Sequence, residues 1–160
     1  MESLERVLRQ HPFFAGLDER CLALLVGCAA NQRYAAGDYL FREGGEAERF
    51  YLLRDGHVTL QVETPARGAI PIETLGPGDV FGWSWLIPPY RWRLDARAAN
   101  EARVFAMDGT CLRAKCEQDH ALGYEVMRRF STIVQRRLDA TRRQLIEIHS
   151  AYCDLVEGRT

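Results

Sequence analysis

The sequence contains no apolar run that approaches the roughly 18 residues of a membrane-spanning helix, and its first residues, MESLERVLRQ, lack the features of a secretory signal. It also lacks an excess of charge of either sign, since 21 basic and 22 acidic residues give a formal net charge of −1. These absences argue against a membrane protein and against a protein that binds nucleic acid through bulk charge. We therefore expect a cytoplasmic protein whose 160 residues, 47% of them hydrophobic, bury a core of their own.

Cysteine is too sparse and too scattered to form a disulfide framework. The five cysteines are odd in number, and a chain of this length builds a core without them, so we expect reduced and mostly buried thiols. The candidate metal-binding groups are Cys111 with Cys116 and His120, and His149 with Cys153. Neither group forms a four-ligand set, and the five- and nine-residue steps of the first group do not converge on one face of a helix, so we expect no metal site.

No catalytic arrangement can be read from the spacing of the polar residues. A metal-dependent enzyme built on a β barrel would need two or three histidines that converge inside the barrel. The four histidines fall mostly in the parts of the chain that we expect to be helical; they are His11, His57, His120 and His149. No Ser–His–Asp or Cys–His arrangement is visible either, so we expect a protein that is not an enzyme.

The hydrophobic pattern predicts helices at both ends of the chain and strands between them. A first helix is expected from Leu4, and Asp18 can cap a second helix, ERCLALLVGCAA. From Asn31 onward, aromatic and β-branched runs alternate with glycine-containing turns; the runs are DYLF, FYLL, HVTLQVET, IPIETL, LDARAAN and RVFAMD. This pattern is typical of an antiparallel sandwich or barrel. We therefore expect a mainly β fold with flanking helices over residues 1–118.

A long helix is expected over residues 119–160, after a short helix that Asp108 caps. Its apolar positions alternate in steps of three and four, and no proline interrupts them. The resulting seam consists of Phe130, Val134, Leu138, Thr141, Leu145, Ile148 and Tyr152. Such a seam packs on the helix's own domain or pairs with a second copy, and the order of helices, strands and seam favours a homodimer.

The stretch GPGDVFGWSWLIPPYRWRLDARAA, residues 76–99, concentrates turn residues, indole rings and fixed cations. Indole rings can stack on a planar ligand, and arginine side chains can hold its acidic group. The candidate ligand-binding residues are therefore Gly82, Trp83, Ser84, Trp85, Arg91, Trp92 and Arg93. In the alternative interpretation, the three tryptophans pack with Tyr90 as an ordinary core.

Two segments together resemble the cyclic-nucleotide-binding domain family, which includes the sensor domains of catabolite activator proteins, cAMP-dependent kinases and gated channels. GDYLFREGGEAERFYLLRDGHVTL, residues 37–60, is similar to the family's aromatic-rich strands with glycine turns. GPGDVFG, residues 76–82, is similar to the start of the family's phosphate-binding cassette. The resemblance spans about residues 11–150. It implies an antiparallel β jelly roll followed by a C-terminal α-helix, and a cyclic nucleotide as the candidate ligand, with no other cofactor.

The cassette departs from the family pattern where the family holds its nucleotide. In the family, the amides of a short helix and a nearby arginine hold the cyclic phosphate, and a glutamate after the glycine binds the ribose. Here GWSWL stands where the family has Gly-Glu-x-Ala-Leu, so Trp83 replaces the glutamate and Trp85 replaces a small residue. The family's phosphate arginine falls on Trp92. Arg91 and Arg93 flank this position, so a shift by one residue would restore the contact.

Contact with DNA is not expected. The arginine pairs of the long helix could contact phosphates, but acidic residues such as Glu125 and Asp139 are spaced to pair with arginines one turn away. The activator proteins append a helix-turn-helix domain after this helix, whereas this chain stops at Thr160. We expect a solvated helix face.

Two functions follow from the sequence. The first is a non-enzymatic regulatory sensor that binds a cyclic nucleotide, or a related anionic planar molecule, in the jelly-roll pocket. It would signal through the C-terminal helix to an unidentified protein partner, because a ligand signals by binding one arrangement better than another. The alternative is a ligand-free, degenerate domain that serves as a dimerising scaffold. The aromatic residues of the cassette fit both.

Overall fold

Polar side chains begin the helices, because each accepts a hydrogen bond from a first-turn amide that has no partner within its helix. In the computed structural model, which describes residues 3–158, Asp18 accepts from the amide of Cys21, and Asp108 accepts from the amide of Cys111. The helices are α1 (Leu4–Gln10), η1 (Pro12–Phe14), α2 (Glu19–Gly27), η2 (Ser84–Leu86), α3 (Gly109–Gln118) and α4 (His120–Val156). Those labelled η are single 3₁₀ turns.

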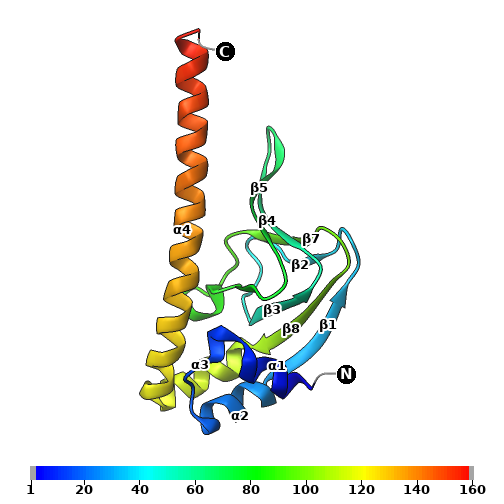
Figure 1. Cartoon of the computed structure of the whole chain (residues 1–160), viewed down its shortest axis with the longest axis vertical. Coiled ribbons are helices and arrows are strands. Elements are labelled where there is room, and N and C mark those ends of the chain that lie inside the picture. Colours follow the sequence, from blue (N-terminus) through cyan, green and yellow to red (C-terminus); the bar gives the residue numbers. More distant parts are fainter. Residues whose placement is uncertain (1–2, 159–160) are drawn as a thin grey trace.

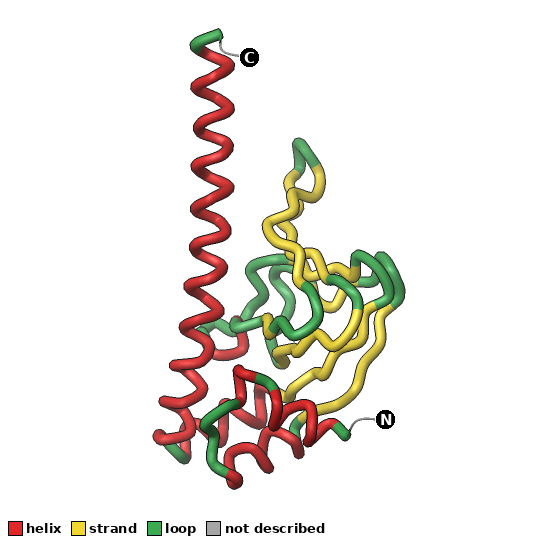
Figure 2. Tube along the Cα trace, in the orientation of Figure 1, coloured by secondary structure: helices red, strands yellow, loops and turns green. Residues whose placement is uncertain are grey.

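Eight antiparallel strands form two four-stranded sheets, with the helices at one end and along one side (Figures 1 and 2). The strands are β1 (Ala29–Tyr34), β2 (Tyr39–Phe41), β3 (Arg49–Asp55), β4 (Val58–Thr64), β5 (Gly68–Leu75), β6 (Val80–Phe81), β7 (Asp95–Ala98) and β8 (Ala102–Asp108). The strand orders are β1-β8-β3-β6 in one sheet and β2-β7-β4-β5 in the other. This architecture confirms the predicted jelly roll with flanking helices and a long C-terminal helix.

The central strand β3 divides the aromatic core into two parts, because neighbouring residues of a strand point to opposite faces. Phe50 faces the helices and contacts the rings of Phe13 and Phe130. The next residue, Tyr51, faces the interior of the sandwich and stacks on Phe41. The four residues 50–53 are therefore all buried.

Helix α4 changes its environment along its length. Its buried residues end at Arg137, and the remainder extends beyond the sheets, beside the β4–β5 hairpin (Figure 1). One contact continues past that point, since Gln144 donates a hydrogen bond to the carbonyl of Pro71 in β5. None of the helices within residues 3–158 has both the length and the apolar character needed to cross a bilayer.

Three details of the prediction are wrong. The thiols are not mostly buried, because Cys21 is buried but the other four cysteines are half-buried. The second helix ends at Gly27 and does not continue to Ala30, because Ala29 and Ala30 pair with β8 as the first residues of β1. Phe130 is 2% exposed and packs inside the fold, so it does not lie on the exposed seam. The other six seam residues are exposed, as a surface for a partner requires.

Candidate functional site

The cassette predicted to hold a ligand follows β6 and begins at Gly82. Gly82 has a φ of +87°, which only glycine adopts at low cost, and a Cβ atom there would lie 3.1 Å from the ring of Trp92. The chain then enters η2, where the amide of Leu86 donates to the carbonyl of Trp83. Both the turn and the ring packed against it therefore require glycine.

Trp92 lies inside the jelly roll, with its ring against the start of the cassette. Its side chain is 6% exposed and stacks on Phe41, with 3.7 Å between ring centroids and 9° between planes. Its backbone is held on both sides, because its amide donates to the carbonyl of Gly45 and its carbonyl accepts from the amide of Gly44, each at 2.9 Å. Trp92, which the sequence predicts as the counterpart of the family's phosphate arginine, is thus an aromatic core residue.

Trp85 is buried completely on the helix side of the sheet. Its ring stacks on Phe50 and meets the edge of Phe130, with centroids 5.2 and 5.5 Å apart. Its carbonyl accepts a hydrogen bond from Arg113 of α3, while its indole N–H has no acceptor within the described part of the chain. Trp85 therefore joins the cassette to α3 and α4 and does not face the interior of the sandwich.

Trp83 is the half-buried member of the three tryptophans, and its indole ring lies beside α4. The guanidinium group of Arg137 lies 5.7 Å from the ring centroid and forms an ion pair with Glu73 of β5. Burial lowers the pKa of Arg137 to about 10, because the charged form loses hydration. This cluster connects the cassette, the β4–β5 hairpin and the long helix.

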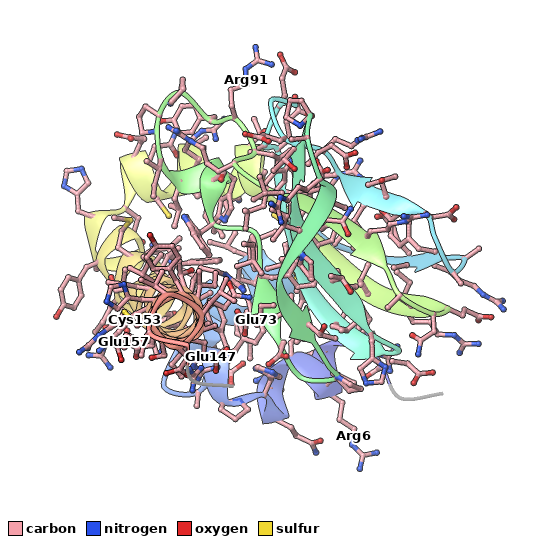
Figure 3. The ribbon with its side chains drawn as sticks, turned by 90° about the horizontal axis from the view of Figure 1, so that it is seen from above. Arg6, Glu73, Arg91, Glu147, Cys153 and Glu157 are labelled. Atoms are coloured by element: carbon pink, nitrogen blue, oxygen red, sulfur yellow. The ribbon has the colours of Figure 1, made fainter. Side chains whose placement is uncertain are left out.

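The two candidate arginines of the cassette are exposed. Arg91 points outward from the molecule (Figure 3), where it donates to the carbonyl of Gly44 at 3.4 Å and lies 3.8 Å from the carboxylate of Glu46. Arg93 is exposed but lines the edge of a small cavity beside Trp83. Five of the seven candidate residues thus line one cavity, namely Gly82, Trp83, Ser84, Trp92 and Arg93. Trp85 lies apart from them on the helix side of the sheet, and Arg91 turns away.

The space left between these residues is about 30 Å³. Its lining consists of Phe41, Leu60, Gly82, Trp83, Ser84, Trp92, Arg93 and Leu94. This volume corresponds to roughly one water molecule, whereas sites for small molecules typically enclose about 300–1,000 Å³. This cavity is therefore too small for a cyclic nucleotide in this arrangement.

Three residues that contact the tryptophans were not candidates from the sequence. Phe41 supports Trp92, Arg113 holds the carbonyl of Trp85, and Arg137 lies beside Trp83. Each is far from its tryptophan in the sequence, and spacing patterns relate only near neighbours. The aromatic enrichment of DYLF was the one signal that bears on Phe41.

The family model of the cyclic nucleotide-binding domain matches residues 31–119. The cyclic nucleotide-gated ion channel 18 of Arabidopsis thaliana is 28% identical over 123 residues, which are 70% of this chain and 17% of the channel. The CRP-like cAMP-activated global transcriptional regulator of Mycobacterium tuberculosis is 23% identical over 145 residues, which are 91% of this chain and 63% of the regulator. The chain therefore spans less than two thirds of either relative.

Solved structures with a similar fold cover most of this chain. A proposed cyclic nucleotide-binding protein from Geobacter metallireducens GS-15 is 31% identical, with a TM-score of 0.76 over 86% of this chain and 99% of that chain. The N-terminal domain of a transcriptional regulator from Streptomyces coelicolor A3(2) is 26% identical, with a TM-score of 0.64 over 84% of this chain and 94% of that chain. Since the family model covers more than half of the residues, this chain belongs to the cyclic nucleotide-binding domain family.

Proposed function

We propose that this chain is a non-enzymatic regulatory module that acts through self-association of α4 and does not use a cyclic nucleotide as its ligand. The observation that carries this proposal is the buried ring of Trp92, which packs on Phe41. We take Trp92 as the counterpart of the family's phosphate arginine. A guanidinium group at this position would hold an anion, whereas an indole ring fills the space and offers no charge. The regulatory role is what the family fold supports.

The contacts that a cyclic nucleotide would lose at this cassette support the proposal. Trp83 in place of the family's glutamate removes a charge-assisted hydrogen bond to the ribose, which is typically worth about 1.5–3 kcal/mol. Loss of the phosphate arginine costs at least as much. Each loss corresponds to roughly tenfold or more in affinity, so we expect a cAMP dissociation constant well above about 1 μM.

The exposed half of α4 supplies a surface for a second copy of this chain. Its apolar side chains remain in one stripe after the helix leaves the fold; they include Leu138 (65% exposed), Leu145 (67%), Ile148 (68%) and Tyr152 (64%). A contiguous apolar stripe in water marks an interaction surface. Because its repeat alternates threes and fours, the stripe is complementary to a copy of itself across a two-fold axis.

A sensor for a different small anion is the second candidate function, and the position of Arg93 favours it. Arg93 stands at the edge of the small cavity, next to the half-buried ring of Trp83. If the ring of Trp92 turned away from Phe41, a planar acid could stack there and pair with Arg93. Such a ligand would reach α4 through the contact between Trp83 and Arg137.

Calorimetric titration of the purified protein with cAMP, cGMP and cyclic dinucleotides tests the proposal. The wild type should show no binding at micromolar concentrations. The double variant Trp83→Glu/Trp92→Arg restores both family residues and should bind cAMP at least about tenfold more tightly. Trp83→Gln/Trp92→Arg is the matched control, because it lacks only the carboxylate. A wild-type dissociation constant for cAMP at or below about 1 μM would overturn the proposal.

A further inference from the structure

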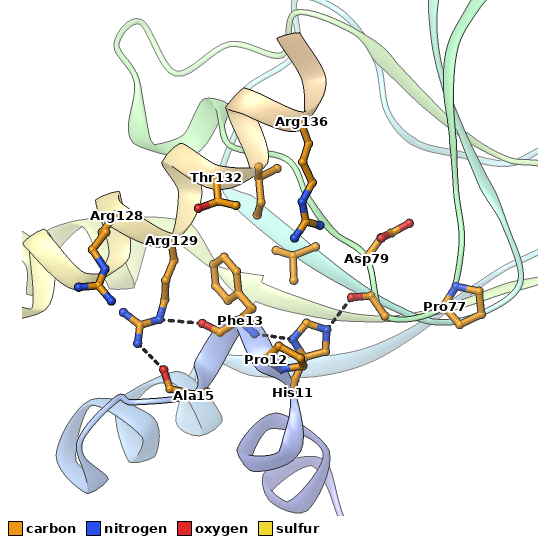
Figure 4. Close-up of a pocket in the computed structure, with 13 residues that line it drawn as sticks. His11, Pro12, Phe13, Ala15, Pro77, Asp79, Arg128, Arg129, Thr132 and Arg136 are labelled. Carbon is orange, nitrogen blue, oxygen red and sulfur yellow. Dashed lines mark hydrogen bonds between the residues drawn. The ribbon is translucent and has the colours of Figure 1, made fainter. Parts of the chain in front are cut away.

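We infer that the protein carries a binding site for a small organic anion, and that this site lies outside the jelly roll and apart from the cassette. A cavity of about 580 Å³ lies between η1, the turn before β6 and the first half of α4 (Figure 4). Its volume is within the range of sites for small molecules, in contrast to the residual space at the cassette. The inference concerns residues that the proposed self-association of α4 does not use, and it stands independently of that function.

Hydrogen bonds between distant segments hold the walls of this cavity in place. The Nδ1 atom of His11 accepts from the amide of Phe13 at 3.0 Å, so Nε2 carries the hydrogen and donates to the carbonyl of Gly78 in the turn before β6. Arg129 of α4 donates to the carbonyl groups of Phe13 and Ala15 (Figure 4). Three segments are therefore connected before any ligand arrives, which reduces the entropy that a ligand would have to offset.

The floor of the cavity is apolar. Val80 of β6 and Ile133 of α4 are 8% and 7% exposed, and Phe13 of η1 is half-buried beside them. Pro12 and Pro77 complete the apolar lining. Such a surface suits a ligand with an apolar or aromatic body, because burying that body against it removes apolar area from water.

The arginines of α4 differ in whether they have a carboxylate partner. Arg129 pairs with Glu125, and Arg137 pairs with Glu73. The two other arginines at the cavity, Arg128 and Arg136, form no ion pair with any residue between 3 and 158. The helix thus leaves two guanidinium groups at the cavity that have no ion-pair partner in the described part of the chain.

Arg136 is placed to anchor an anion. Its guanidinium group extends into the cavity toward His11 and Asp79, while Arg128 lies at the other end, beside Arg129 (Figure 4). Eight residues of helix separate the two arginines by about 12 Å along the axis, and their guanidinium groups lie at opposite ends of the cavity, so a single acidic group contacts only one of them (Figure 4). Arg136 therefore binds the acidic group directly, and Arg128 adds positive potential from a distance.

Asp79 limits the class of ligand. It is the one carboxylate that lines the cavity in the described part of the chain, and one of its oxygens already accepts from the amide of Gly76 at 2.8 Å. A ligand with a second, separate acidic group would bring that group near Asp79 and be repelled, whereas a ligand with one acidic group keeps its charge on Arg136. The site therefore suits one phosphate or carboxylate group attached to a small apolar body, held by a planar guanidinium fork.

Phenyl phosphate is a suitable probe, because it joins one phosphate to one aromatic ring. Titration of the ¹⁵N-labelled protein should shift the amide resonances of Gly78, Val80 and Ile133, with a dissociation constant in the low millimolar range or below, about −4 kcal/mol. Inorganic phosphate has the acidic group of the probe without its ring, and phenol has the ring without the phosphate, so each should bind more weakly than phenyl phosphate. Shifts confined to Gly82–Leu86 would place the anion at the cassette and would overturn the inference, as would no binding at about 10 mM.

Variants of exposed arginines separate a specific site from general charge. Arg136→Gln should weaken the binding of phenyl phosphate about tenfold, because a charge-assisted contact is lost, and Arg128→Gln should weaken it only about two- to threefold. The matched control is Arg142→Gln, an exposed arginine of the same helix that does not line the cavity, and it should leave affinity unchanged. If Arg136→Gln and Arg142→Gln weakened the binding of phenyl phosphate equally, the effect would come from net charge and not from a specific site, and the inference would be overturned. Sedimentation of the same variants reports self-association separately.

Discussion

The indole ring of Trp92 stacks on the phenyl ring of Phe41, with centroids 3.7 Å apart and planes 9° apart. Tyr51 continues this stack from Phe41, and Phe81 continues it from Tyr51. These four rings therefore form one continuous aromatic group inside the jelly roll. Dispersion between these rings and burial of their surface stabilise this packed interior.

Replacing Trp92 with alanine should destabilise the fold by about 3–5 kcal/mol, because the substitution removes buried apolar surface and leaves a cavity. Urea unfolding followed by circular dichroism measures the loss. Trp92→Phe is the matched control, since it keeps a ring on Phe41 and should cost clearly less. A loss below about 1 kcal/mol for the alanine variant would contradict a packed ring.

Replacing Glu73 should destabilise the fold more than replacing Arg137, although the two side chains form one ion pair. The side chain of Arg137 is 10% exposed, whereas that of Glu73 is 31% exposed. Glu73→Gln leaves a buried guanidinium group without its counter-charge, so we expect a loss of about 3–5 kcal/mol in the free energy of unfolding. Arg137→Met removes the buried charge and keeps the apolar packing, so its loss should be smaller. Urea unfolding of both variants measures the difference, and equal losses would refute it.

The apolar stripe of α4 should hold two copies together. Aspartate at both Val134 and Ile148 would place charges in the interface, so this double variant should sediment as a monomer at tens of micromolar while the wild type sediments as a dimer. Ser150→Asp is the control, because it adds a charge to α4 away from the stripe. A wild type that is monomeric at this concentration would mean that the stripe does not pair with itself.

Cys28 and Cys111 should form a disulfide under mild oxidation. Their Sγ atoms lie 3.5 Å apart, and all five cysteines are free thiols. Oxidised glutathione should accept the two electrons and two protons of the pair, which yields two molecules of glutathione and an intramolecular disulfide. Peptide mass spectrometry would identify the linkage; Cys28→Ser should abolish it, and Cys153→Ser should not. A mixed disulfide at either cysteine as the only product would contradict the pairing.

The same pair predicts a dependence of stability on pH. Burial, followed by the hydrogen bond to Cys111, raises the pKa of Cys28 to about 11 in the folded protein. A group whose pKa is raised on folding stabilises the fold below its unfolded pKa, near 8.5, and loses this contribution as the pH rises through the folded value. The stability of the reduced protein should therefore fall between about pH 8.5 and 11. Urea unfolding across this range should show a smaller fall for Cys28→Ser.

The type and order of the elements followed from local patterns. Asp18 and Asp108 precede their helices as predicted and cap them, and the glycine-containing turns separate the strands. The error at the end of α2 has a clear cause. Ala29 and Ala30 favour helix by propensity, but pairing with Met107 and Ala106 in β8 draws them into β1. Tertiary pairing outweighed a local preference of a few tenths of a kcal/mol.

The sequence by itself determined the helices, the strands, the seam spacing and the resemblance to the family, because each of these depends on residues that lie close together in the chain. Only the tertiary structure decided that Trp92 packs on Phe41, that Phe130 faces the core and that Arg91 turns outward to Glu46. Periodicity defines a stripe on a helix but does not specify which neighbour covers it. A ring or a cation in a loop likewise takes the direction that its distant contacts allow, and those contacts form only when the whole chain folds.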